Sequence, residues 1–351
     1  MGLEDKILKI EGIPHESIGR MVVVDRTEIE IPKCSIEELS KEEDYLRQNL
    51  TELYNSEEAK GIIGMAGVIG VGKTTMACHL QKWTQGLKYL ERTNSPGLNC
   101  LYAKGGKQIF GFPYQFDVGS DREKIMQSVD GAGKSGIVDR TWQEDMLFAE
   151  NFYKMGALTE RQFNYVKKFI IDGVKRNKQP DVIISLQASD DTLNERVKER
   201  NRKIEMQGIK SLSEQERNEM ILKKEEMLGY VKKFAPEELE DYRIRQAGFE
   251  IPKEILMEGA PPEYIIQLNG FYKTRLTTML DQDFEYNGVL LKINVDSKDG
   301  IDARRDTYGQ VPIMRALKEA RILSLLRKGY SIVEKANREG LDITPPWKAK
   351  K

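Results

Sequence analysis

The sequence predicts an α/β fold in which a five-stranded parallel sheet is covered by helices on both faces. Short apolar runs recur along the chain, with helical and charged stretches between them. The first run leads into a glycine-rich turn and then an amphipathic stretch over residues 74–83. Strands that alternate with helices favour a parallel sheet, because each crossover needs a long connection. The expected strands lie within residues 61–67, 87–90, 136–138, 182–186 and 289–295.

Composition argues against several classes of protein. The chain has 351 residues, of which 39% are hydrophobic and 32% charged, with a formal net charge of −1. Balanced charge does not favour a nucleic-acid partner, and no run approaches the roughly 20 apolar residues of a membrane span. Two histidines make a histidine-based metal site or a Ser-His-Asp triad improbable. Three cysteines without a CxxC pair are typical of reduced thiols, so we expect a cytoplasmic protein.

The pattern along the chain indicates a core with additions at both ends. A strand is expected over residues 21–31, followed by a helix over 35–60 that begins with a capping box of Ser35 and Glu38. The expected segments are an N-terminal extension (1–60), the core (61–234), a helical insertion (235–285), the last core strand (286–300) and a C-terminal helical extension with a polar tail (301–351).

The glycine-rich turn matches a phosphate-binding loop in full. Its pattern is Gly67-x4-Gly72-Lys73-Thr74, with a further glycine at Gly70. Glycines let backbone N–H groups face an anion, and the following helix adds the positive end of its dipole. In this pattern the lysine reaches the β- and γ-phosphates and the threonine hydroxyl binds Mg²⁺, so we predict ATP and Mg²⁺ as cofactors. A chance turn beside a surface lysine is the alternative, which the strand before it and the helix after it disfavour.

Two charged residues, Asp139 and Arg140, end the third expected strand. In open parallel sheets, ligands bind beyond the carboxyl ends of the strands. Asp139 would then approach Mg²⁺, directly or through water, and Arg140 would approach a phosphate. A strand-end salt bridge is the alternative, and without the phosphate loop the two interpretations would be about equally favoured.

Two further features suit phosphoryl transfer. A helix expected after residue 189 carries Arg196, Arg200 and Arg202, which are candidates for a lid over a triphosphate. Taken alone, the interleaved glutamates favour a solvated helix face instead. Glu91 closes the second expected strand and is a candidate base for an acceptor hydroxyl, although surface glutamates are common.

Together these residues resemble the deoxynucleoside kinase family, especially its bacterial deoxyadenosine/deoxyguanosine members. The resemblance runs from about residue 61 to residue 207, with a fainter match at 289–295. It implies the P-loop kinase fold. The motifs that carry it, in chain order, are GVGKTT with the strand ending in Glu91, FGFPYQ (110–115) with Arg122, DRT…D…FA (139–149), and PDVII (180–184) with the three arginines.

The resemblance implies a role for each matching residue. Glu91 would be the base on the 5′-hydroxyl, Gln115 would pair with the base edge, and Arg122 and Asp145 would form a charge pair in the base pocket. Arg140 would contact the 5′-oxygen or the transferring phosphate, and the lysine of the loop would also be catalytic. The remaining implied contacts are phosphate contacts at Gly67, Gly70, Gly72, Lys73, Thr74, Thr75, Arg196, Arg200 and Arg202, sugar contacts at Tyr102 and Glu205, and base stacking at Phe112 or Trp142.

The implied reaction is ATP-dependent phosphorylation of a deoxynucleoside, with purines favoured and a homodimer or higher oligomer expected. The sequence departs from the family at Arg92, where proline is usual, and in residues 1–60, 235–285 and 301–351, which could bind a protein partner. A thymidylate-type monophosphate kinase stays open, because Arg92 could serve an acceptor phosphate. An ATP-binding regulatory or assembly subunit without turnover also stays open, as do the base preference and the phosphate donor.

Overall fold

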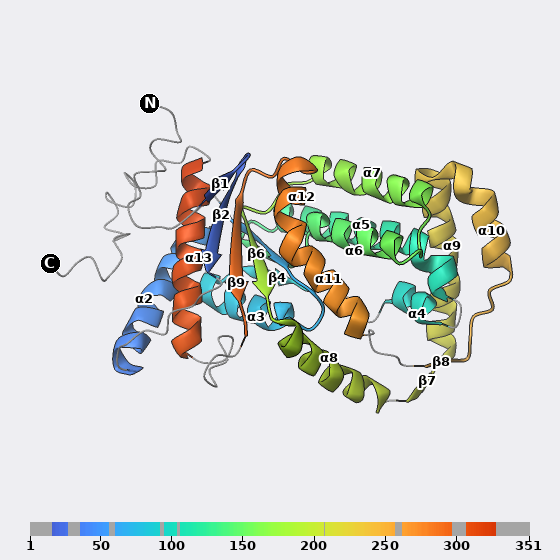
Figure 1. Ribbon diagram of the computed structural model, residues 1–351, viewed down its shortest axis with the longest axis horizontal. Helices are drawn as coiled ribbons and strands as arrows, with labels where there is room; N and C mark the ends of the chain where they lie inside the picture. Colours follow the sequence, from blue (N-terminus) through green and yellow to red (C-terminus); the bar gives the residue numbers. More distant parts are fainter. Residues whose placement is uncertain are drawn as a thin grey trace.

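The fold is built around one large sheet with helices on both faces (Figure 1). The computed structural model describes residues 16–26, 36–55, 60–91, 95–103, 106–206, 208–256, 262–296 and 307–327. The strands of the large sheet are β1 (Glu16–Ile18), β2 (Met21–Arg26), β3 (Ile62–Ala66), β4 (Leu87–Tyr89), β5 (Gly136–Asp139), β6 (Val182–Gln187) and β9 (Val289–Asn294).

The strand order is β1-β2-β9-β6-β3-β5-β4. The five predicted strands are present as β3, β4, β5, β6 and β9, and all of their pairings are parallel. Their apolar runs are continuous rather than alternating because helices cover both faces of the sheet. The predicted α/β class is therefore confirmed.

The predicted number of strands is wrong, because the sheet has seven strands rather than five. The additional strands come from the N-terminal segment: β2 pairs in parallel with β9, and β1 pairs antiparallel with β2. Residues 21–24 of β2 are buried. Strand β2 thus covers the edge of β9 that would otherwise be open, and its buried side chains add to the core. Of the strand expected over residues 21–31, residues 21–26 form β2, whereas residues 27–31 and Ser35 of the expected capping box lie outside the described residues.

Two layers of helices cover the sheet (Figure 1). Helices α2 (Ile36–Asn55), α3 (Lys73–Thr84) and α13 (Thr307–Arg327) pack on one side, and α13 lies directly on α2. The other side carries α5 (Gly106–Gly131), α6 (Trp142–Lys154), α7 (Glu160–Arg176), α11 (Pro262–Thr274) and α12 (Leu276–Gln282). Segments from the two ends of the chain thus pack together beside the sheet.

Of the remaining elements, α8 lies beside α11, and the others lie beyond α5. Helix α9 packs against α4 and α5, and its Phe234 joins an aromatic cluster with Phe116 and Phe169. Strands β7 and β8 form a short antiparallel ribbon that the sequence did not predict. These elements are α4 (Pro96–Tyr102), α8 (Asp190–Glu205), β7 (Ile209–Ser211), α9 (Glu214–Phe234), η1 (Pro236–Glu238), α10 (Leu239–Ala247) and β8 (Glu254–Leu256).

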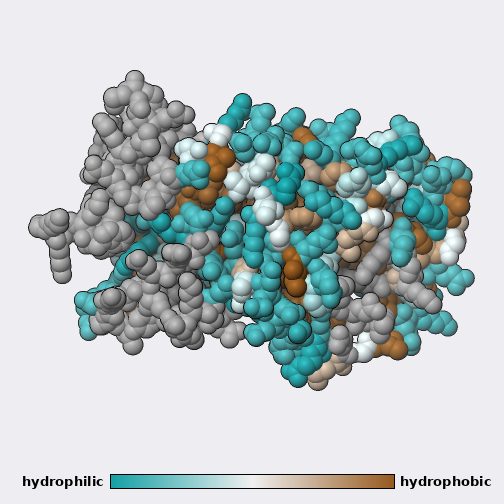
Figure 2. Space-filling view, in the orientation of Figure 1, coloured by the Kyte–Doolittle hydropathy of each residue, from teal (hydrophilic) through white to brown (hydrophobic). Residues whose placement is uncertain are grey.

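The expected helical insertion packs against the core. Its helix α11 contacts β6, α6 and α8, so its side chains can approach the loop that follows β3. The division of the chain at residues 60, 234 and 285 stays a prediction. The face shown in Figure 2 is mostly hydrophilic, with hydrophobic residues in small separate patches. None of the described helices is both long and apolar enough to cross a bilayer.

Candidate active site

The phosphate loop connects β3 to α3 at the carboxyl edge of the sheet. Gly67 and Gly72 have φ of 145° and 106°, and Gly70 also has a positive φ. A Cβ on Gly67 would lie 2.9 Å from the backbone oxygen of Leu186, so only glycine fits there. Gly72 is the N-cap of α3 and makes no side-chain capping bond. The first N–H groups of α3 are therefore available to an anion.

Lys73 is folded back over the loop. Its Nζ donates to the carbonyl oxygens of Gly67 and Val68, the latter at 3.3 Å, and lies 3.9 Å from Glu144 Oε1. Burial, assisted by the positive charge of Arg140, lowers the pKa of Lys73 to about 8. The lysine therefore favours an anionic ligand that would restore its charge.

The Thr74 hydroxyl donates to Asp139 Oδ2 at 3.0 Å. The other carboxylate oxygen of Asp139, Oδ1, is buried and has no hydrogen-bond partner within the part of the chain that is described. A hydroxyl and a carboxylate with an unsatisfied oxygen, next to a phosphate loop, suit a Mg²⁺ ion that is also bound by phosphates. Thr75, the next residue of the loop helix, is exposed.

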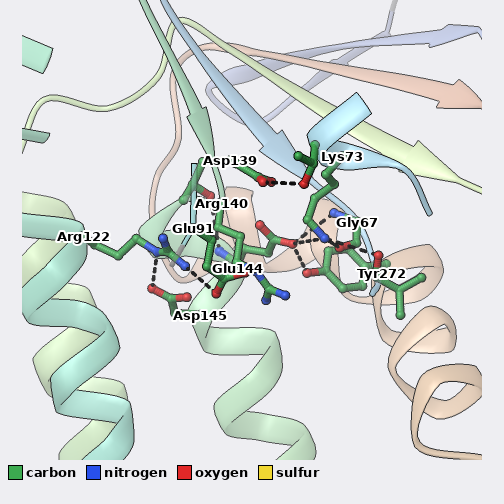
Figure 3. A network of polar contacts seen from close by, with 12 residues as sticks. Gly67, Lys73, Glu91, Arg122, Asp139, Arg140, Glu144, Asp145 and Tyr272 are labelled. Carbon is green, nitrogen blue, oxygen red and sulfur yellow. Dashed lines mark hydrogen bonds and ion pairs between the residues drawn. The ribbon is translucent and has the colours of Figure 1, made fainter. Parts of the chain in front are cut away.

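Glu91 lies just after β4 and is held by two arginines (Figure 3). Its carboxylate accepts from Arg140 Nε at 2.7 Å and from Arg122 Nη2 at 3.4 Å. Burial alone would raise the pKa of Glu91, but Arg140, Arg122 and Lys73 outweigh burial and lower it. The Glu91 side chain keeps 32% of its surface exposed, so it can reach a ligand while it is ionised.

Arg140 has a backbone φ of 105°, in a region that side chains rarely occupy. The surroundings hold it there: its guanidinium pairs with Glu91 and lies 4.2 Å from the centre of the Phe148 ring. Such strain is concentrated at functional sites in proteins. This backbone turn aims the arginine across the edge of the sheet, toward Lys73 and Glu91 (Figure 3).

The predicted charge pair of the base pocket is present in the geometry. Arg122 Nε donates to Asp145 Oδ2 at 3.3 Å, and both side chains are buried. Burial raises the pKa of Asp145 to about 6, against the opposing effect of Arg122. Gln115 is also buried on α5 and donates to the Gly111 carbonyl at 3.3 Å, which leaves its carbonyl oxygen for another partner.

The two candidates for base stacking are both buried in the core. Phe112 packs edge-on against Phe116, with ring centres 5.2 Å apart. Trp142 packs edge-on against Phe169 at 5.6 Å. Their packing accounts for both rings without a ligand, so stacking on a base stays a prediction.

Of the three arginines on α8, the structure brings only Arg196 to the loop. Its guanidinium donates to the carbonyl oxygens of Val71 at 3.4 Å and Val295 at 3.0 Å. Arg200 is exposed, and Arg202 is exposed and paired with Glu199 at 3.1 Å. The described geometry of Arg202 is thus that of a solvated helix face. Tyr102 and Glu205 end α4 and α8, but their side chains lie outside the described residues.

Sequence reasoning missed two residues of this site, Glu144 and Tyr272. Glu144 is fully buried, and its Oε1 accepts from the Gly67 N–H at 3.1 Å and from the Tyr272 hydroxyl. The residues around Glu144 in the sequence do not indicate that its carboxylate is buried near Lys73. Tyr272 is 128 residues away, in the segment expected to be an insertion.

Comparisons with known proteins bear on the family resemblance. Residues 63–227 match the family model described as deoxynucleoside kinase. The match covers a little under half of the chain. A deoxyadenosine kinase from Dictyostelium discoideum is 33% identical over 144 residues, which cover 41% of this chain and 58% of the relative. The chain therefore spans little more than half the length of that relative. The predicted family resemblance is confirmed.

Solved structures of deoxyadenosine kinase from M. mycoides are also similar to the chain. The complex with dCTP has a TM-score of 0.46 at 18% identity and covers 73% of this chain and 98% of that one. The complex with dATP has a TM-score of 0.45 at 20% identity, with coverages of 72% and 96%.

Proposed function

We propose that this protein transfers the γ-phosphoryl group of ATP to the 5′-hydroxyl of a deoxynucleoside, with purine deoxynucleosides preferred. The observation that carries the proposal is the Glu91 carboxylate, held by Arg140 and Arg122 beside the phosphate loop. A nucleoside acceptor needs a group that takes its proton, and a fixed, ionised carboxylate can do so. The match to the deoxynucleoside kinase family model supports the acceptor class, and the similarity to a deoxyadenosine kinase supports the purine preference.

In the proposed mechanism the loop binds the triphosphate through its backbone N–H groups and the start of α3. Lys73 would leave the carbonyl oxygens of Gly67 and Val68 and contact the β- and γ-phosphates. Thr74 and Asp139 would hold Mg²⁺, which neutralises phosphate charge when bound. Because Arg196 already contacts the loop, it is the lid arginine best placed to reach a phosphate.

The acceptor side is proposed to use the remaining charged residues. Glu91 would orient the 5′-hydroxyl and accept its proton, while Arg140 would stabilise charge on the phosphoryl group as it transfers. Gln115 would pair with the base edge, and the Arg122–Asp145 pair would line the same pocket. Phosphoryl transfer asks mainly for alignment and charge neutralisation, and these residues can supply both.

A chromatographic assay of the purified full chain tests the proposal. The protein is incubated with Mg²⁺-ATP and each of the four deoxynucleosides and their 5′-monophosphates, with Lys73→Ala as the inactive control. We expect monophosphates from deoxyadenosine or deoxyguanosine and no product from the control. Diphosphates formed only from monophosphates would reassign the protein to the monophosphate kinases. Intact ATP binding with no product from any acceptor would favour a regulatory subunit.

A further inference from the structure

A buried carboxylate lies at the beginning of the phosphate loop. Glu144 on α6 is fully buried, and its Oε1 accepts from the Gly67 N–H at 3.1 Å and from the Tyr272 hydroxyl (Figure 3). The same oxygen lies 3.9 Å from Lys73 Nζ, which is beyond hydrogen-bond distance. Oε2 is buried and finds no hydrogen-bond partner among the described residues. The carboxylate is thus held by two donors next to a cation that it does not contact closely.

The tyrosine that holds this carboxylate is itself fixed. Tyr272 is 2% exposed and lies near the end of α11. Three residues earlier, the buried Asn269 donates to the Ala188 carbonyl at 3.2 Å and to Asp190 Oδ1 at 2.8 Å, which ties α11 to the start of α8. Burial and the neighbouring Glu144 raise the pKa of Tyr272 well above its ordinary value, so the phenol keeps its proton and remains a donor.

The two hydrogen bonds to Glu144 keep its negative charge away from Lys73. In a poorly solvated environment, opposite charges attract strongly, so an unrestrained Glu144 would move onto Lys73. Lys73 would then be neutralised by the protein and would bind phosphate less well. Two hydrogen bonds to Oε1 oppose this movement, because hydrogen bonds to a charged group are among the stronger ones in proteins.

We propose that Tyr272 is a positioning residue for nucleotide binding. Its hydroxyl holds the Glu144 carboxylate on the Gly67 N–H and keeps it from capturing Lys73. Helix α11, outside the segment that matches the kinase family, thereby sets the affinity of the phosphate loop. The inference rests on the proposed function only in that the loop binds a nucleotide, and it does not depend on the acceptor.

The test measures ADP binding to the full chain by titration calorimetry, without an acceptor. Tyr272→Phe removes only the hydroxyl, and we expect the Kd for ADP to rise about tenfold, the scale of one hydrogen bond to a charged group. Tyr165→Phe is the matched control, because it removes a tyrosine–glutamate hydrogen bond, to Glu237, at the exposed surface of α7. The control should bind ADP as the original protein does.

A second variant separates positioning from a structural role. In Tyr272→Phe/Glu144→Gln the amide cannot neutralise Lys73, so ADP affinity should recover to within about threefold of the original protein, because the competing charge is gone. A purely structural loss would not be rescued in this way. Thermal unfolding of each variant confirms that it is folded.

Two outcomes would overturn the proposal: an unchanged Kd for Tyr272→Phe, or a double variant that binds ADP no better than Tyr272→Phe alone. Failure of the proposed kinase function would look different, because ADP would bind normally while no deoxynucleoside is phosphorylated.

Discussion

Replacing Glu91 by glutamine tests the proposed chemistry most directly. The amide keeps the size of the side chain and an oxygen that can accept from Arg140, whose Nε lies 2.7 Å from the carboxylate. It cannot take a proton from the acceptor hydroxyl. Loss of a general base costs about 10²- to 10⁴-fold in rate, so we expect kcat to fall about 100-fold or more.

The structure also predicts what should not change. The hydrogen bonds of Glu91 are made with Arg140 and Arg122 and not with the phosphate loop. The Kd for ADP should therefore stay within about twofold of the original value. The arginine side chains in these pairs are only 3% and 9% exposed, so removing the charge of Glu91 should lower the free energy of unfolding by about 1–3 kcal/mol. The melting temperature should consequently fall by several degrees, and the protein stays folded at the temperature of the assay.

The assay is steady-state production of the deoxynucleoside monophosphate at saturating ATP, with calorimetry for ADP. Glu123→Gln is a matched control, since Glu123 is 33% exposed and forms a comparable pair with Arg176 away from the site. A Glu91→Gln enzyme with a kcat within tenfold of the original would remove Glu91 from the role of base. A large rise in the Kd for ADP would show that the side chain acts on the loop instead.

The pH profile separates Glu91 from Asp145. Because the pKa of Glu91 is below its ordinary value, Glu91 is ionised throughout the neutral range and adds no inflection there. The pKa of Asp145 is raised to about 6 by burial. A carboxylate that must be ionised loses function as pH falls, so kcat/KM for the deoxynucleoside should decrease below about pH 6. Asp145→Asn should abolish that inflection, and its persistence in Asp145→Asn would contradict the assignment.

Three further predictions concern other parts of the fold. The Kd for ADP should rise as pH increases through about 8, because Lys73 loses its proton there in the free protein. The free energy of unfolding should instead increase above pH 8, because the unfolded lysine holds its proton to higher pH and the cost of burying the charge is then lost. Asp139→Asn should weaken Mg²⁺ binding, so the Mg²⁺ concentration for half-maximal rate should rise about tenfold or more in a metal titration at fixed ATP. Arg321→Met should lower the free energy of unfolding by about 3–5 kcal/mol, measured by urea titration, because it removes a buried ion pair with Asp181 at 3.3 Å.

Features that depend on a few neighbouring residues could be predicted from the sequence. The run before Gly67 and the glycines after it specify strand, loop and helix locally. Asp139 and Arg140 were placed correctly at the edge of the sheet because parallel strands bring their carboxyl ends together. Glu91 was a weaker candidate, chosen because it closes a strand with a carboxylate that could act as a base. The roles of these residues stay predictions, while their proximity is shown.

Features that depend on distant pairing could not be predicted. The pairing of β2 with β9 joins Val22 to Val289, and nothing local in either strand selects that partner. The contact of Tyr272 with Glu144 likewise joins two helices that are far apart in the chain. The arginines of α8 could be assigned to one helix from the sequence. Which of them contacts the loop could not be predicted, because the contact of Arg196 with Val71 depends on how the helix packs.

The buried pair of Arg321 and Asp181 lies at the end of the sheet opposite the candidate active site. Asp181 precedes β6, and its Oδ2 accepts from the Ile62 N–H at 2.6 Å, at the amino end of β3. Arg321 on α13 also donates to the Leu53 carbonyl at the end of α2. The C-terminal helix, the N-terminal helix and the central strand are thus joined at one buried point. The phosphate loop begins at the other end of β3, so Arg321→Met should destabilise the fold while the folded fraction keeps its kcat. A fall in kcat for the protein that remains folded would show that the two ends are coupled.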